Sequence, residues 1–370
     1  MGNYREDSFA SVWSNKKYRR LRRSLLTGVD LTPYCDVCEY CFDGPAWMMQ
    51  LHMGLHALGS GERSEAIVDL VRRRIDRYDE YTREAPRRGL SIYPRPGDLP
   101  PSSRKVAKAG SSIIPEALVS CVSLPIHMDF NTINRCNASC VMYPPALRFN
   151  DHGIRWAPYY RLTLDEYKKI TDGIRIESAH FVGAYAEPLL NKELFVLIEY
   201  THKQDAFTAI TTNATLLSRK FSERLIDADL DQISISLHGA TKEVAEAVMR
   251  GSDFHKVIGN IRTLQKIKRE RDSLKPEIFI NFVGQRINAR DLPPFIDLAH
   301  ELGIKYVNFI HLIDGDKVVD KSRNLIHYPD LLVESVAAAE ERASATGVVL
   351  DVSSGYRDMI NAYQCDSSKG

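Results

Sequence analysis

The sequence predicts an α/β fold built around a parallel β-sheet, and three observations lead to this prediction. From residue 124 onward, short apolar segments alternate with longer segments of helical, amphipathic period. This alternation is repeated about six times, as expected for consecutive right-handed βαβ units. The composition, with 44% hydrophobic and 26% charged residues, is that of a globular protein with a buried core. The repeats leave two architectures open, a doubly wound open sheet and a complete or partial barrel.

The predicted strands and helices follow one another in a regular order. The strands are expected at residues 124–130, 178–184, 206–213, 231–237, 277–284, 305–312 and 348–353. The helices are expected at residues 162–174, 191–203, 218–228, 252–272, 289–303 and 329–347. In both architectures the carboxyl ends of parallel strands meet at one edge of the sheet, so the active site is expected there.

The part of the chain before this alternation has a different pattern. Residues 7–26 have a helical period with a basic opposite face, residues 46–85 predict two helices, and residues 85–112 are a Pro-, Arg- and Ser-rich linker or surface loop. No apolar run reaches the roughly 18 residues of a membrane span. The formal net charge is +1, which favours neither nucleic acid nor an acidic membrane as a partner. We therefore expect a cytoplasmic protein.

The seven cysteines are unevenly placed along the chain. One cluster consists of Cys35, Cys38 and Cys41, and a second consists of Cys136 and Cys140. An odd number, local clustering and the absence of a secretion signal favour metal or cluster ligation over a disulfide framework. Buried structural thiols are the alternative interpretation.

The loop after the first predicted strand, NTINRCNASCVMYPP, resembles the cluster loop of radical S-adenosylmethionine (SAM) enzymes, whose pattern is Cys-x3-Cys-x2-Cys. Cys136 and Cys140 match its first two positions. The resemblance implies a partial parallel (β/α)6 barrel over residues 119–355. It also implies a 4Fe–4S cluster held by three thiolates, with one iron open for SAM.

Three further segments resemble motifs of the same family in the same order. VGAYAEPLLN matches a Gly-Glu-Pro motif through Glu187 and Pro188, and TTNATLLS matches a Thr-Asn-Gly motif through Asn213. ISISLHGATKE resembles the segment whose second serine faces the ribose, here Ser236. By this resemblance, these four residues would bind SAM.

The chain departs from the family pattern at three positions. Tyr143 stands where the third cluster cysteine is expected, and Ala186 and Ala214 replace motif glycines. A phenol has a pKa near 10 and offers a hard oxygen, which is a poor substitute for a thiolate on iron–sulfur. Two interpretations remain open. Either the cluster is bound weakly, with Tyr143, another residue or a small thiol at the third iron, or the barrel has lost its cluster.

Both ends of the chain resemble parts of SPASM domains, the auxiliary-cluster extensions of many radical SAM enzymes. Residues 1–45 resemble the closing part, so Cys35, Cys38 and Cys41 would hold an auxiliary iron–sulfur cluster; a zinc knuckle that uses His52 or His56 is the alternative. The expected organisation is a SPASM-like fragment (1–45), a helical segment and linker (46–118), the barrel (119–355) and the start of a truncated SPASM-like extension (356–370).

Polar residues near the ends of the fifth and sixth predicted strands are further candidates. Asn281 and Gln285 could contact substrate or cofactor, or could form hydrogen bonds to neighbouring strands. His311, at the carboxyl mouth where substrate would sit, could act as a general acid/base or could cap a loop.

The resemblance implies an enzyme that reductively cleaves SAM to a 5′-deoxyadenosyl radical. This radical would modify a peptide or small metabolite by hydrogen abstraction, with a reductase as electron donor. The alternative, from another functional class, is a catalytically degenerate barrel that binds a peptide or a partner protein.

Overall fold

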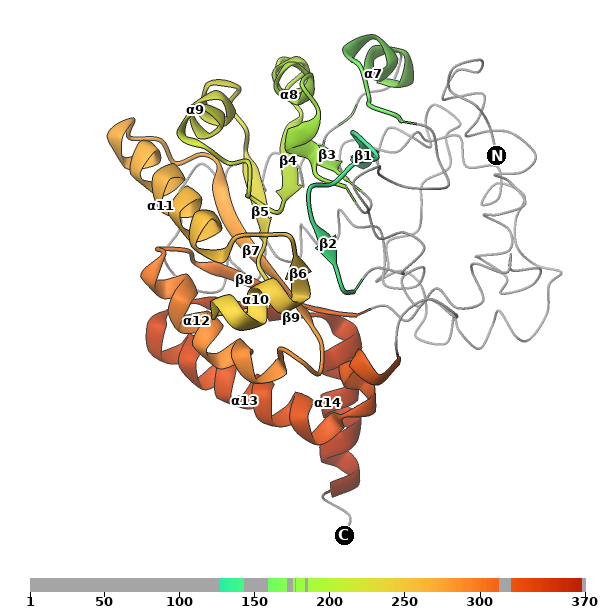
Figure 1. The fold of residues 1–370 in the computed structure, drawn as a ribbon, viewed down its shortest axis with the longest axis vertical. Coiled ribbons are helices and arrows are strands. Elements are labelled where there is room, and N and C mark those ends of the chain that lie inside the picture. The colour runs from blue at the N-terminus through green and yellow to red at the C-terminus, as the bar shows by residue number, and fades with distance from the viewer. Residues whose placement is uncertain are drawn as a thin grey trace, which may run out of the picture. The chain divides into compact units, whose positions relative to one another are not determined.

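A computed structural model describes residues 127–142, 159–171, 176, 178–183, 186–312 and 321–367 (Figure 1). The predictions for residues 1–45 and 46–118, including the N-terminal cysteine cluster, lie outside the described residues, and so does Tyr143. The chain divides into two compact units, and the unit with the predicted motifs comprises residues 128–164 and 178–370. No helix in the described ranges has the length and apolar character needed to span a bilayer.

Seven strands form the main sheet of this unit, and all seven predicted strands are confirmed. Their spatial order is β1 (His127–Asn131), β3 (Ser178–Val182), β4 (Phe207–Thr212), β5 (Gln232–Ser236), β7 (Glu277–Gly284), β8 (Tyr306–His311) and β9 (Val349–Val352). From β3 to β9, neighbouring strands pair in parallel. The spatial order follows the chain order without reversal, which is the winding of a barrel, since a doubly wound sheet reverses at a switch point. Because β1 and β9 stand at the two edges, the barrel is partial.

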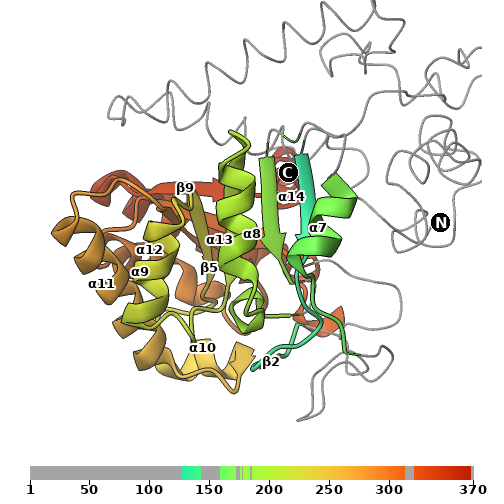
Figure 2. The same cartoon turned by 90° about the horizontal axis from the view of Figure 1, so that it is seen from above.

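Helices cover one side of this curved sheet, as Figures 1 and 2 show for α8, α9, α11, α12 and α13. The predicted helices are confirmed, with ends up to three residues shorter than expected. The observed helices are α7 (Leu164–Thr171), α8 (Leu194–His202), α9 (Arg219–Asp227), α10 (Lys242–Val248), α11 (Phe254–Glu270), α12 (Leu292–Glu301), α13 (Pro329–Thr346) and α14 (Ser354–Ser367). Their boundaries have local causes: the side chains of Ser218 and Asp253 cap α9 and α11, and Gly347, in the left-handed region at φ 75°, ends α13.

Short elements complete the unit. The 3-10 helices are η2 (Pro188–Leu190), η3 (Ala289–Asp291), η4 (Lys321–Arg323) and η5 (Leu325–His327). A second sheet contains the antiparallel strands β2 (Ser139–Cys140) and β6 (Met249–Arg250). The sequence analysis did not predict this sheet, because two-residue strands carry no measurable period. It also did not predict α10.

The two faces of the main sheet differ in polarity. Phe282 on β7 packs edge-on against Phe295 of α12, so the side chains in line with Phe282 face the helices. This face is apolar and buried, through Phe181, Ile210, Ile233, Ile280, Val307 and Phe309. It supplies the hydrophobic core that holds the helices on the sheet.

The opposite face carries polar side chains on six adjacent strands. His180 on β3 contacts Asp129 on β1 at 2.9 Å and Thr211 on β4 at 2.8 Å. Asn308 on β8 donates to Asn281 on β7 at 2.8 Å, and Ser234 on β5 lies in register with Thr211. The interior of the partial barrel is therefore suited to polar ligands.

Helix α14 packs on the apolar side of this unit. The ring of Tyr356 is fully buried, with its centroid 4.9 Å from that of Phe309, and its hydroxyl donates to the Gly284 carbonyl at 2.8 Å. Most of α14 lies in the segment that the sequence analysis assigned to the start of an extension, residues 356–370. The boundary predicted there stays a prediction, but Tyr356 itself is part of the barrel core.

We expect Tyr356→Phe to lower the free energy of unfolding by about 1–2 kcal/mol, because the buried Gly284 carbonyl loses its hydrogen-bond donor. Urea denaturation measures this change. Tyr363→Phe, on the same helix, is the matched control, since its hydroxyl contacts the exposed Asp330, and its effect should stay within about 0.5 kcal/mol. Equal losses in both variants would contradict the assigned role of the Tyr356 hydroxyl.

Candidate functional site

The structure brings the cysteine loop to the carboxyl ends of the strands. Cys140 is buried in an apolar cluster with Met142, Val248, Met249 and Leu312, and Cys136 packs against the same cluster. Leu312 directly follows β8, so this cluster lies at the strand ends, where a parallel α/β protein binds its ligands. Both cysteines thus contact one cluster at the strand ends.

Backbone hydrogen bonds hold this loop from two sides. Cys140 pairs with Met249 in the small sheet, and the Val141 N–H donates to the Val248 carbonyl at 2.9 Å. On the other side, the Glu187 N–H donates to the Arg135 carbonyl at 2.8 Å. The cysteine loop is therefore connected to the segments after β3 and β5.

Asn213, directly after β4, joins the cysteine loop to the strand ends. Its amide nitrogen donates to Asn137 Oδ1 at 2.9 Å and lies 3.8 Å from Cys136 Sγ. Its amide oxygen accepts from the N–H and hydroxyl of Thr215 at 3.0 and 2.6 Å, and Asn137 in turn donates to the Thr215 hydroxyl at 2.6 Å. These three side chains form one network around the first thiol.

Glu187 is almost fully buried, with 1% of its surface exposed. Its carboxylate accepts hydrogen bonds from the Thr212 hydroxyl at 2.7 Å, the Asn213 N–H at 2.7 Å and the Leu189 N–H at 3.0 Å. Burial raises the pKa of Glu187 to about 7, although these hydrogen bonds oppose the rise. The side chain is thus engaged in fixing the end of β4 relative to η2, which begins with the buried Pro188.

The structure accommodates the two alanines at motif-glycine positions differently. Ala186 lies against Gly183, where an added Cβ would be only 2.6 Å from the Ala186 Cβ, so a neighbouring glycine makes its space. Ala214 has a φ of 56° and is fully buried. This left-handed conformation costs an alanine roughly 1–2 kcal/mol. Replacing the motif glycine at this position therefore strains the backbone.

Ser236 ends β5 on the polar face of the sheet, in register with Asn281. Its side chain is half-buried, and its hydroxyl has no hydrogen-bond partner within the described part of the chain. Two residues later, His238 is buried, and its Nδ1 accepts a hydrogen bond from the Val283 N–H at 3.1 Å. Burial lowers the pKa of His238 to about 4, so the imidazole is neutral at physiological pH.

The three further candidates have different surroundings. Asn281 accepts the hydrogen bond from Asn308, and the His311 ring stacks edge-on against Tyr356 on the side of the sheet that faces α14. Gln285 is fully buried, and neither polar atom of its side chain has a partner among the described residues.

Cys136 and Cys140 fit two of the three protein ligands of the 4Fe–4S cluster that the sequence resemblance implies. Burial raises the pKa of Cys136 to about 11; burial and the neighbouring Cys136 raise the pKa of Cys140 to about 12. Both thiols are protonated at neutral pH without metal, so cluster binding must release their protons. In the described ranges, no three His, Cys, Asp or Glu side chains gather as a metal site. A 4Fe–4S cluster with one open iron needs three thiolates, and position 143 carries a phenol.

The sequence analysis missed several residues of this region. Asn137 and Thr215 belong to the Asn213 network, and His238 lies in a predicted motif without an assigned role. Asn137 directly follows a candidate ligand, and this adjacency was the signal that could have identified it. Thr215 had no such signal, because the fold brings it to the loop from 78 residues away.

Comparisons with known proteins show which family part of the chain is similar to. Residues 130–299 match the family model of the radical SAM superfamily. The chain is 29% identical over 203 residues to the GTP 3′,8-cyclase of Aliarcobacter butzleri (strain RM4018), covering 52% of this chain and 58% of that protein. It is 26% identical over 182 residues to the PqqA peptide cyclase of Bradyrhizobium diazoefficiens, covering 48% of this chain and 44% of that protein. The chain thus spans about half the length of these relatives.

A solved structure supports the same fold. The crystal structure of Streptococcus suis SuiB bound to S-adenosylmethionine matches with a TM-score of 0.50 at 14% identity. The match covers 77% of this chain and 62% of SuiB. At this identity the likeness concerns the fold alone.

We expect the buried, neutral His238 to make the protein sensitive to acid. Its pKa is lowered from 6.5 to about 4 in the folded state, so its contribution to stability is present above pH 6.5 and is lost as the pH falls toward 4. The shift corresponds to about 3 kcal/mol. His238→Asn keeps an acceptor for the Val283 N–H and removes the titration. Between pH 7 and pH 4, this variant should therefore lose about 3 kcal/mol less than the unchanged protein.

Urea denaturation at each pH measures this difference. The exposed His300, changed to Asn, is the matched control, and its curve should follow that of the unchanged protein. If the His238→Asn curve also followed the unchanged protein, His238 would not be the acid-sensitive group.

Proposed function

We propose that the chain is a radical SAM enzyme, because residues 130–299 match the family model of the radical SAM superfamily. Members of this superfamily use a 4Fe–4S cluster and SAM. Cys136 and Cys140 would hold the cluster, and the third iron would be bound by Tyr143, another residue or a small thiol. When bound, the cluster would supply the one-electron reduction that releases methionine and a 5′-deoxyadenosyl radical from SAM, and this radical would take a hydrogen atom from the substrate.

One observation carries this proposal: the amide nitrogen of Asn213 reaches both Asn137 and the Cys136 sulfur. The cysteine loop and the end of β4 are thereby held in one network, whose far side is fixed by the buried Glu187 carboxylate. In this arrangement Glu187 would contribute to SAM binding indirectly, because its carboxylate fixes the position of Asn213. Pro188 would contribute by fixing the start of η2. Ser236 offers a half-buried hydroxyl at the end of β5 for the nucleoside.

The proposed substrate is a peptide or a small metabolite. The relatives include a peptide cyclase and a nucleotide cyclase, which supports both classes. The polar interior face of the sheet, from Asp129 to Asn308, suits either of them. A reductase would supply the electron, and the N-terminal Cys35, Cys38 and Cys41 would hold an auxiliary cluster.

A second candidate function is a catalytically degenerate barrel that binds a peptide or partner protein. The donor set favours it, because Tyr143 replaces a thiolate by a phenol. The strained backbone at Ala214 points the same way, since glycine would adopt this conformation without cost.

Anaerobic reconstitution with iron and sulfide separates these two functions. The enzyme is expected to show 4Fe–4S absorption and, with a chemical reductant and SAM, to release 5′-deoxyadenosine. The full chain is compared with a Cys136→Ser variant, which should lose both signals at the barrel. If the unchanged chain showed neither 4Fe–4S absorption nor release of 5′-deoxyadenosine, the enzyme function would be excluded and the binding function would remain.

We expect Tyr143→Cys to raise the iron content of the barrel toward four atoms per chain, because it restores the third thiolate. The measurement is made in a background in which Cys35, Cys38 and Cys41 are changed to Ser, so that only iron in the barrel is counted. Tyr143→Ser is the matched control, since it removes the phenol without adding a thiolate. If the two variants bound equal amounts of iron, the cluster pocket would have decayed at other positions too.

A further inference from the structure

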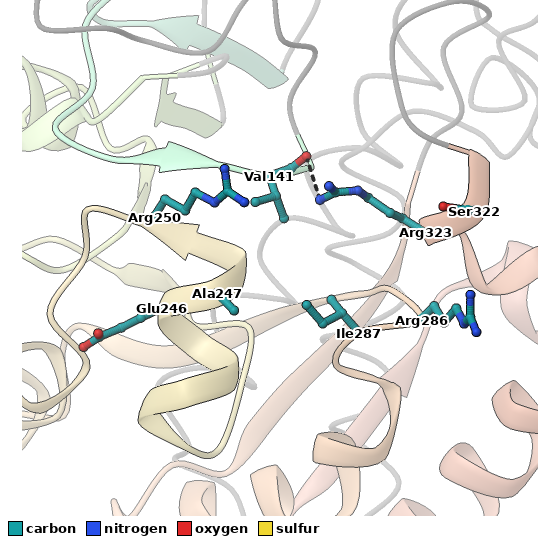
Figure 3. A pocket seen from close by; sticks show the side chains of 8 residues that line it. All are labelled: Val141, Glu246, Ala247, Arg250, Arg286, Ile287, Ser322 and Arg323. Carbon is teal, nitrogen blue, oxygen red and sulfur yellow. Dashed lines mark hydrogen bonds between the residues drawn. The ribbon is translucent and has the colours of Figure 1, made fainter.

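A pocket of about 510 Å3 opens beside the cysteine loop (Figure 3). Its wall includes Val141, the residue after Cys140, and three arginines from separate segments. Arg250 comes from β6, Arg286 follows β7, and Arg323 ends η4. Figure 3 shows Arg250 and Arg323 extending toward Val141 from opposite sides. A volume of this size is typical of a small-molecule site.

Contacts within the fold place each arginine. Arg250 pairs through its backbone with Ser139 of the cysteine loop, and the Arg323 guanidinium lies 3.5 Å from the Val141 carbonyl oxygen. The Arg286 N–H donates to the Arg323 carbonyl at 2.7 Å. The Arg286 guanidinium also stacks over Tyr328, 4.6 Å from the ring centroid, and donates to its hydroxyl at 3.2 Å. Contacts within the fold therefore position the arginines around the pocket.

The positive charge of the pocket is not matched by its one acidic wall residue. Glu246 accepts a hydrogen bond from the Phe254 N–H at 3.0 Å and so caps the start of α11. In Figure 3 its carboxylate points away from the arginines. Within the described ranges, no carboxylate forms an ion pair with Arg250 or Arg286. The guanidinium groups of Arg250 and Arg286, next to a cavity, favour an anionic ligand, because such groups can bind phosphate or carboxylate oxygens through paired N–H groups.

We propose that this three-arginine pocket binds the phosphate or carboxylate groups of a multiply charged substrate. Arg250 and Arg286 come from separate segments, which favours a ligand with at least two negative charges. Because Val141 is both a wall of the pocket and the neighbour of Cys140, a ligand anchored here lies beside the cysteine loop. The assignment of this ligand as the substrate rests on the proposed function, whereas the binding itself does not need a cluster.

Binding is therefore measured calorimetrically on the cluster-free full chain, with inorganic tripolyphosphate and with a tetraglutamate peptide as separate probes. The unchanged protein is expected to bind at least one probe saturably. Arg250→Gln and Arg286→Gln should each weaken that binding about tenfold or more, because each removes a charge-assisted contact. Tighter binding of tripolyphosphate indicates a phosphorylated substrate, and tighter binding of the peptide indicates an acidic one.

Arg290→Gln is the matched control. This arginine lies four residues after Arg286, is exposed, and is not part of the pocket wall. An equal loss of affinity in Arg290→Gln would show general surface charge and overturn the proposal, as would no binding of either probe. Complete displacement of the probe by SAM would also overturn it, since the pocket would then belong to the cofactor. Failure of cluster reconstitution would contradict the proposed function but leave this binding result unaffected.

Discussion

The buried carboxylate of Glu187 is the constraint on which the arrangement of the candidate site depends. A buried charge is costly unless hydrogen bonds satisfy it, and here three donors do so. Two of them, the Thr212 hydroxyl and the Asn213 N–H, come from the end of β4, and the third comes from η2. Satisfying one carboxylate thus fixes the end of β4 relative to η2, and Asn213 extends this connection to the cysteine loop.

The framework around the loop is retained although its donor set is short of one thiolate. The loop keeps two backbone connections, the Asn137–Asn213–Thr215 network and a buried position for Cys140. Ala214 even keeps a left-handed backbone at which glycine carries no penalty. The same framework supports the adjacent arginine pocket, because Arg250 is paired directly with the loop.

Most of the fold could be predicted because it is repetitive. Each strand and each covering helix of the barrel has its own hydrophobic period, so the strands and helices predicted from residue 124 onward were found. The small sheet of β2 and β6 was missed because its strands have two residues each. Periodicity also could not choose between a doubly wound sheet and a barrel. The order in which strands pair made that choice, and pairing order depends on contacts distant in sequence.

By itself, the sequence determined the alternation of strands and helices and the positions of four family motifs, since these depend on local pattern and residue identity. Only the tertiary structure decided what the motif residues touch. It directed the Glu187 side chain to Thr212 and Asn213, and it turned His311 toward Tyr356. It also brought together three arginines from residues 250 to 323 that no spacing connects. The physical reason is that the hydrophobic period of a segment indicates only which of its side chains share one face of a helix or strand. Contacts between elements follow from packing and strand order.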